Sequence, residues 1–154
     1  MIDYVAVERL ARAELGAASS SVDAMTRLIA VLKDRVAHYS WVGVYLLDGE
    51  ELVLGPYLGK PSPHTRIPLG QGICGAAAAT KSTIVVDDVN SDPRYLACSI
   101  ETKSEIVVPV FVRGKVAGEL DIDSHFLAAF GPDDRKLCEH AAAVLGKFLE
   151  THAQ

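Results

Sequence analysis

Three carboxylates alternate with apolar residues in the segment GELDIDS, residues 118–124. In a strand, side chains two residues apart point the same way, so Glu119, Asp121 and Asp123 share one face. Like charges about 7 Å apart repel one another, so this face is either solvated or holds a cation or hydrogen-bond donors. Antiparallel strands often have one solvated face, and the sequence leaves both interpretations open.

A fourth carboxylate, Glu105, begins the apolar strand EIVVPVFV. If this strand and GELDIDS pair as a hairpin, Glu105 lies near Asp121 or Asp123. Clustered carboxyls raise the pKa of one member, which then keeps a proton near neutral pH for general-acid chemistry. Cys98 lies seven residues before Glu105 in a polar stretch. A thiol close to a carboxylic acid is typical of a redox or group-transfer site.

The other two cysteines lie in apolar surroundings. Cys74 is flanked by glycines in GICG and begins a predicted helix, whose N-terminus would favour the thiolate. It is equally well interpreted as a small buried residue, and Cys138, in the middle of a helix, is predicted to be structural. We expect no metal, because the spacings of ten and twenty-four residues between His64, Cys74 and Cys98 match no short ligand motif.

Two aromatic residues stand four apart in the first predicted strand. Trp41 and Tyr45 therefore point to the same face. Large aromatic side chains are most often part of the core, and they also form the walls of pockets. We expect core packing first and a pocket wall second.

The order of helices and strands along the chain predicts an α+β fold in a single domain, residues 1–154. We expect a central, mostly antiparallel sheet that is flanked by N- and C-terminal helices. Helical periodicity and caps, strand alternation and turn residues mark the elements. We predict helices at 3–15, at 20–38 and from Pro132, and a short buried helix within 70–82. The apolar face of the second helix is formed by Val22, Met25, Ile29, Leu32 and Val36. We predict a hairpin at 41–59 that turns at Asp48-Gly49, and strands at 82–89, 104–114 and 115–124.

Charge and composition disfavour several partners. The chain carries 15 basic and 20 acidic residues, and no Lys/Arg run exceeds two, so we expect neither nucleic acid nor anionic lipid as a partner. No apolar run approaches the 18 residues that span a bilayer, and the N-terminus, with Asp3, Glu8 and Glu14, does not resemble a signal peptide. An odd number of three cysteines also fits a reducing compartment, so we expect a cytoplasmic protein.

Five motifs carry a family resemblance: WVGVYLL, LVLGPYLGKP, RIPLGQGICGAAAAT, YLACSIETKSEIVVPV and GELDIDS. Over residues 22–149 the chain resembles the single-domain GAF proteins that act as free methionine-(R)-sulfoxide reductases. The resemblance implies that Cys98 is the nucleophile that becomes a sulfenic acid. It also implies that Glu105, Asp121 and Asp123 hold the ammonium group of the substrate and protonate its sulfoxide oxygen. Trp41 and Tyr45 would enclose the methyl end.

The chain departs from this family at one position. The family usually carries a cysteine ten residues before the cysteine of GICG, and this cysteine forms a disulfide with the oxidised nucleophile. In this chain His64 occupies that position, and the segment before it is one residue longer than is usual in the family. Cys74 matches a second family cysteine. It could bridge to Cys98 if their Cα atoms come within about 7 Å, and thioredoxin would then reduce the disulfide. Otherwise a small external thiol must reduce Cys98; no cofactor is implied.

Two functions other than a reductase remain possible interpretations of the sequence. A GAF sensor that binds a small ligand without turnover would explain the missing cysteine. A structural dimerisation protein would leave the thiol and the carboxylates unexplained, although a homodimer through the outer sides of the terminal helices is expected. A peptide-bound substrate is disfavoured because a peptide bond offers the carboxylates no α-ammonium group.

Overall fold

A computed structural model describes residues 1–97 and 99–152 of the chain. Within these residues the strands form one six-stranded sheet in the order β3-β2-β1-β6-β5-β4, and every neighbouring pair is antiparallel. The predicted α+β class is confirmed. The strands are β1 (Trp41–Asp48), β2 (Glu51–Leu58), β3 (Arg66–Pro68), β4 (Ile84–Val86), β5 (Ser104–Val112) and β6 (Lys115–Ser124).

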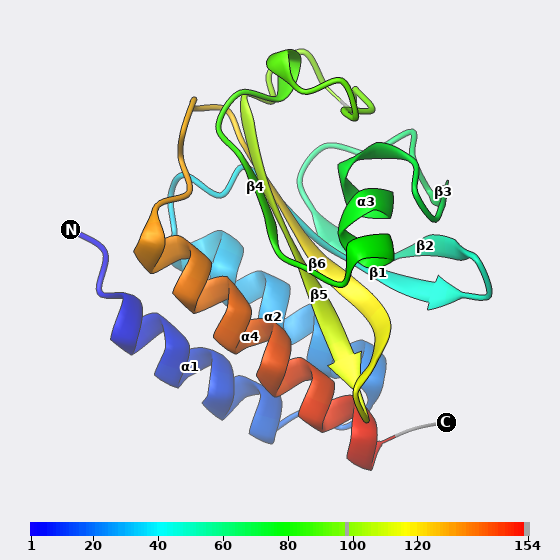
Figure 1. Cartoon of the computed structure of the whole chain (residues 1–154). Coiled ribbons are helices and arrows are strands. Elements are labelled where there is room, and N and C mark those ends of the chain that lie inside the picture. Colours follow the sequence, from blue (N-terminus) through cyan, green and yellow to red (C-terminus); the bar gives the residue numbers. More distant parts are fainter. Residues whose placement is uncertain (98, 153–154) are drawn as a thin grey trace.

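Three helices lie on one side of this sheet: two of them pack against the strands, and the first packs on these two helices (Figure 1). They are α1 (Tyr4–Gly16), α2 (Ser21–Arg35) and α4 (Pro132–Thr151), and the side chains of Asp3 and Ser20 cap the first two. Their apolar stripes and the helix-facing side chains of β1, β5 and β6 form the larger core. α2 and α4 therefore pack on the same sheet face, and α1 covers these two helices.

The predicted apolar face of α2 is wrong at Val22, which is 61% exposed. The buried face is centred on Leu28, with Met25, Ile29 and Leu32 beside it. At 3.6 residues per turn, Val22 lies about 120° around the helix from Leu28, outside the stripe that meets the sheet.

The opposite face of the sheet carries α3 (Gly72–Thr80), and the segment that follows β4 arches over one end of the sheet (Figure 1). A second, smaller core lies beneath α3. The segment after β4 includes a 3₁₀ turn at Val89–Ser91. Neither this turn nor β3 is predicted from the sequence. Each spans three residues, too few to show a period.

Two turns close the hairpins that carry the site. Asp48 pairs with Glu51, so the first turn lies at Gly49-Glu50, one residue later than predicted. Gly49 has φ 63°, a conformation that glycine adopts without strain. The β5–β6 hairpin turns at Arg113-Gly114, since Val112 pairs with Lys115.

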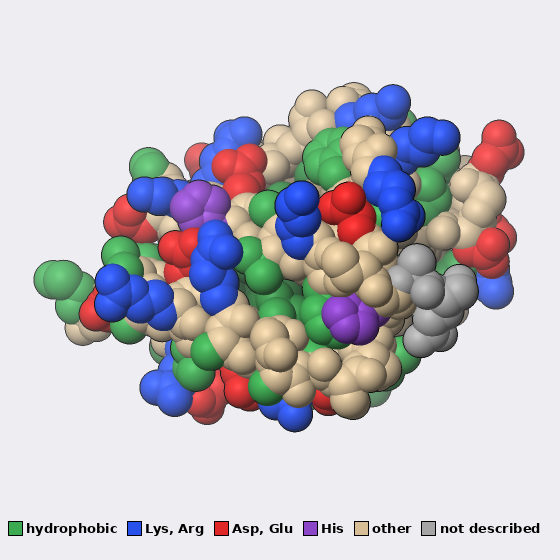
Figure 2. Space-filling model, turned by 90° about the horizontal axis from the view of Figure 1, so that it is seen from below, with side chains coloured by type: hydrophobic (Ala, Val, Ile, Leu, Met, Phe, Trp, Pro, Cys, Tyr) green, Lys and Arg blue, Asp and Glu red, His purple; other side chains and the backbone are tan. Residues whose placement is uncertain are grey.

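Surface charge is mixed on the side seen from below. Lys and Arg side chains are interspersed there with Asp and Glu (Figure 2). Within the described residues, no helix is both long and apolar enough to cross a membrane.

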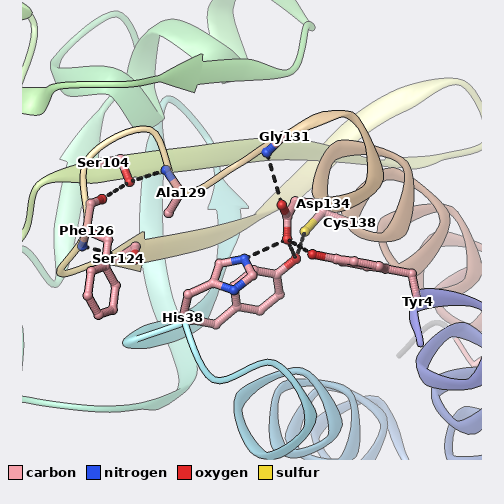
Figure 3. Close-up of polar contacts among 10 residues, drawn as sticks. Tyr4, His38, Ser104, Ser124, Phe126, Ala129, Gly131, Asp134 and Cys138 are labelled. Carbon is pink, nitrogen blue, oxygen red and sulfur yellow. Dashed lines mark hydrogen bonds and ion pairs between the residues drawn. The ribbon is translucent and has the colours of Figure 1, made fainter. Parts of the chain in front are cut away.

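A polar network fixes the start of α4 against α1 and the segment that follows α2 (Figure 3). Asp134 Oδ1 accepts hydrogen bonds from Tyr4 and Tyr39 hydroxyls at 3.0 and 2.9 Å and lies 2.8 Å from His38 Nε2, while Oδ2 accepts from the backbone N–H of Gly131 at 3.0 Å. Cys138, one turn on, is fully buried beside Tyr39. Burial raises the pKa of Cys138 to about 12, so this thiol is structural, as predicted.

Candidate functional site

The carboxylates of β5 and β6 lie together on the sheet face beneath α3. Glu105 stands opposite Asp123 in the β5–β6 register, and Asp121 stands opposite Val107. Glu105, Asp121 and Asp123 are 4 to 6% exposed and Glu119 is fully buried. The hairpin thus brings Glu105 and Asp123 together, and the interpretation of this face as solvated is wrong.

The first turn of α3 places a thiol within the cluster. Cys74 Sγ donates a hydrogen bond to Asp121 Oδ2 at 3.3 Å. One ligating atom from each of Cys74, Glu105 and Asp121 lies within 4.8 Å of the other two. The glycine at 75 lets α3 lie close to the segment before it, because a Cβ there would come within 2.8 Å of the backbone oxygen of Pro68.

The expectation that the helix N-terminus favours a Cys74 thiolate is wrong. Burial raises the pKa of Cys74 well above its usual value, and the nearby carboxyls of Asp121, Glu119 and Glu105 raise it further. A short helix end cannot offset the loss of solvent and three acidic neighbours. Cys74 is a neutral thiol in this structure.

The buried carboxyls have raised pKa values. Burial raises the pKa of Glu105 well above its usual value, and Asp121 and Asp123 raise it further. Burial is also the main cause of the raised pKa values of Glu119, Asp121 and Asp123. These shifts favour the protonated form of the carboxyls, the state that general-acid chemistry requires.

Several oxygens of the cluster lack a hydrogen-bond donor among the residues that the structure describes. Oδ1 of Asp121 and Oδ1 of Asp123 are buried without a partner, while Glu119, also buried, has the Cys74 thiol as a hydrogen-bond partner. A buried oxygen without a donor is costly unless a proton or a cation satisfies it. The site is therefore suited to bind a positively charged group.

Trp41 and Tyr45 lie on the same sheet face as the carboxylates. Trp41 stands opposite Asp123, and Tyr45 stands opposite Glu119. Both are buried in the smaller core, and each also lines a cavity. Their polar atoms hold the loop between β2 and β3, since Trp41 Nε1 donates to the carbonyl of Lys60 and the Tyr45 hydroxyl to that of His64.

Two small cavities border the carboxylates. One, of about 20 Å³, is lined by Cys74, Glu105 and Asp121 together with Tyr45, His64 and Leu96. The other, of about 50 Å³, is lined by Asp123, Trp41 and Ser99, among others. They have room for about one water molecule and a few, respectively.

Cys98 lies outside the described residues, so its distance from Cys74 is not described. The residues beside it frame the site: Leu96 lines the smaller cavity and Ser99 the larger. His64 Nε2 lies 3.0 Å from the carbonyl oxygen of Ala97. His64 therefore contacts the chain immediately before Cys98.

Three charged residues near the larger cavity are missed by sequence reasoning. The Lys60 ammonium pairs with Glu101, whose other carboxyl oxygen lies 3.9 Å from His125 Nδ1. They come from three separate loops and no spacing links them, so the sequence contains no signal for this cluster.

Comparison with known proteins confirms the family resemblance. The GAF domain family matches residues 22–149. The chain is 34% identical to the free methionine-R-sulfoxide reductase of Escherichia coli over 148 residues, 96% of this chain and 89% of that protein. It is 40% identical to the Saccharomyces cerevisiae protein of the same name over 119 residues, covering 75% and 66%. The Neisseria meningitidis free methionine-R-sulfoxide reductase, solved with its substrate, superposes with a TM-score of 0.92 at 39% identity, covering 97% of this chain and 89% of that one.

Proposed function

The chain belongs to the GAF domain family, and from that premise we propose that it reduces free methionine-(R)-sulfoxide to methionine. Relatives that carry this name match nearly the full chain in sequence and in structure. The observation that carries the proposal is the buried cluster of Glu105, Asp121 and Asp123, which borders cavities lined by both neighbouring segments of Cys98.

The cluster supplies what a free amino-acid sulfoxide needs. Asp121 and Asp123 each have a buried oxygen with no donor among the described residues, and an α-ammonium group would donate to both. Glu105, whose pKa is raised by burial and by these two neighbours, holds a proton for the sulfoxide oxygen. A peptide-bound methionine sulfoxide lacks the ammonium group and would leave these oxygens unsatisfied.

The chemistry begins at Cys98. Its thiolate attacks the substrate sulfur, and the carboxyl cluster protonates the sulfoxide oxygen. The oxygen passes to the cysteine as a sulfenic acid, and methionine leaves as a thioether. The cysteine sulfur is oxidised by two electrons and the substrate sulfur is reduced by two. The aromatic rings of Trp41 and Tyr45 enclose the methyl end.

The sulfenic acid then condenses with a second thiol, releasing water and forming a disulfide. His64 replaces the cysteine that the family resemblance assigns to this step. Cys74 is the remaining candidate inside the site, with thioredoxin reducing the resulting bridge. Its thiol is neutral, buried and bonded to Asp121, so it must be deprotonated to react quickly. A small thiol acting directly on Cys98 is the alternative.

Methionine release separates these routes. Wild-type protein, Cys74→Ser and Cys98→Ser are supplied with free methionine-(R)-sulfoxide, first with dithiothreitol and then with a thioredoxin system. We expect wild type to release methionine and Cys98→Ser to release none. If Cys74 resolves, Cys74→Ser loses only the thioredoxin-driven rate. Wild type that releases no methionine with either reductant would overturn the assignment.

A second candidate function is a GAF sensor that binds methionine sulfoxide without turnover. The observation that favours it is His64, which removes the usual resolving thiol. A sensor would bind the sulfoxide equally well in wild type and Cys98→Ser, and would release methionine in neither. Calorimetric titration of both proteins, beside the release assay, distinguishes the two functions.

A further inference from the structure

We propose that Cys74, Glu105 and Asp121 form a binding site for a thiophilic divalent cation, with Zn²⁺ as the best match. These residues come from α3, β5 and β6, and they meet at the smaller cavity. One sulfur and two carboxylate oxygens are ligands that zinc accepts in proteins.

The geometry is close to that of a bound ion. Cys74 Sγ and Asp121 Oδ2 are 3.3 Å apart, and the three ligating atoms lie within 4.8 Å of one another. In a tetrahedral zinc site the sulfur and an oxygen are separated by about 3.6 Å, as follows from the usual Zn–S and Zn–O distances. A side-chain rotation that closes the longest gap by about 1 Å completes the arrangement.

Unsatisfied oxygens supply a second, independent indication. Asp121 lines the cavity at 4% exposure, and its Oδ1 has no hydrogen-bond donor among the described residues. Glu119 is fully buried, and the Cys74 thiol acts on its carboxyl both through charge and as a hydrogen-bond donor. Buried acceptors without donors are what a cation satisfies.

The cavity has the size of one ion. At about 20 Å³ it holds a single water molecule or ion. Three protein ligands leave the fourth tetrahedral position for a water, the arrangement found in zinc sites that exchange ligands. Binding replaces the thiol hydrogen of Cys74 and the carboxyl hydrogen of Glu105 by the metal, and both are released as protons.

Occupation of this site would inhibit the reductase. Glu105 and Asp121 cannot hold the substrate ammonium while they ligate a metal, so Zn²⁺ would compete with methionine sulfoxide. This second half of the inference rests on the proposed function. Metal binding itself does not, and it is measured without turnover.

Cobalt spectroscopy tests the ligands directly. Co²⁺ is added to metal-free wild type, Cys74→Ser, Cys98→Ser and the control Cys138→Ser. A sulfur-to-cobalt charge-transfer band should form in wild type, Cys98→Ser and Cys138→Ser, and be lost in Cys74→Ser. A band absent from wild type, unchanged in Cys74→Ser, or lost only in Cys98→Ser would overturn the site.

Zinc titration provides a measurement that is independent of the cysteine variants. Glu105→Gln should weaken Zn²⁺ binding at least about 100-fold, since it removes a ligand, whereas the exposed control Glu50→Gln should bind like wild type. Zinc-edge X-ray absorption of the wild-type complex should show one sulfur at about 2.3 Å. A first shell without sulfur, or equal binding by both variants, would contradict the proposal.

Discussion

Glu105 on β5 lies directly opposite Asp123 on β6, and both carboxyls are buried on the sheet face that carries α3. Two anions cannot share such a place, so at least one of the pair carries a proton. Glu105→Gln keeps the shape and removes this proton. We expect it to lower kcat/KM for methionine-(R)-sulfoxide by about 100-fold or more. Glu50→Gln, on the exposed first turn, is the matched control, and equal losses in both variants would count against the acid role.

Stability should fall as pH rises. The buried carboxyls have raised pKa values, so the folded protein holds protons that the unfolded chain releases above its ordinary pKa values, 3.8 for Asp and 4.5 for Glu. Because the folded state binds more protons in this range, the free energy of unfolding decreases from about pH 5 upward. Glu119→Gln should make that decline shallower by up to about 1.4 kcal/mol per pH unit. Urea unfolding at pH 5, 6.5 and 8 measures it, and parallel curves for wild type and variant would refute it.

Gly146 lets α4 lie against β5. A Cβ at this position would overlap the backbone oxygen of Phe111. Alanine is the better helix former by about 1 kcal/mol, so Gly146→Ala would stabilise an isolated helix. We expect it instead to lower the melting temperature, because helix or strand must move. Gly16→Ala, where nothing lies within 4 Å of a Cβ, is the control and should leave the melting temperature unchanged or raise it.

Asp134 joins α4 to α1 and to the segment between α2 and β1 through one carboxyl. Asp134→Ala would leave the Tyr4 and Tyr39 hydroxyls and the Gly131 N–H without their acceptor. Since each orphaned donor costs about 1 to 3 kcal/mol, we expect the free energy of unfolding to drop by about 3 kcal/mol or more. Asp134→Asn keeps an acceptor oxygen and should lose less. Urea denaturation of both variants provides the comparison, and identical values would show that the network contributes little.

The sequence predicts the scaffold better than the environment of the site. Alternation in GELDIDS places Asp121 and Asp123 on one strand face, because that depends only on the period of a strand. What covers this face depends on α3 and on the segment after β4, which are distant in sequence, so burial of the carboxyls was undecided. The neutral state of Cys74 was mispredicted for the same reason: its helix position is local, while its acidic neighbours come from β5 and β6.

A single-turnover experiment tests the central claim most directly. Reduced protein is mixed with excess free methionine-(R)-sulfoxide without any reductant, methionine is quantified, and sulfenic acid is trapped with dimedone and located by peptide mass. The mechanism predicts about one methionine per chain and an oxidised Cys98, found as the dimedone adduct or as a disulfide to Cys74, with neither product in Cys98→Ser. Absence of methionine from wild type, or equal release by Cys98→Ser, would contradict it.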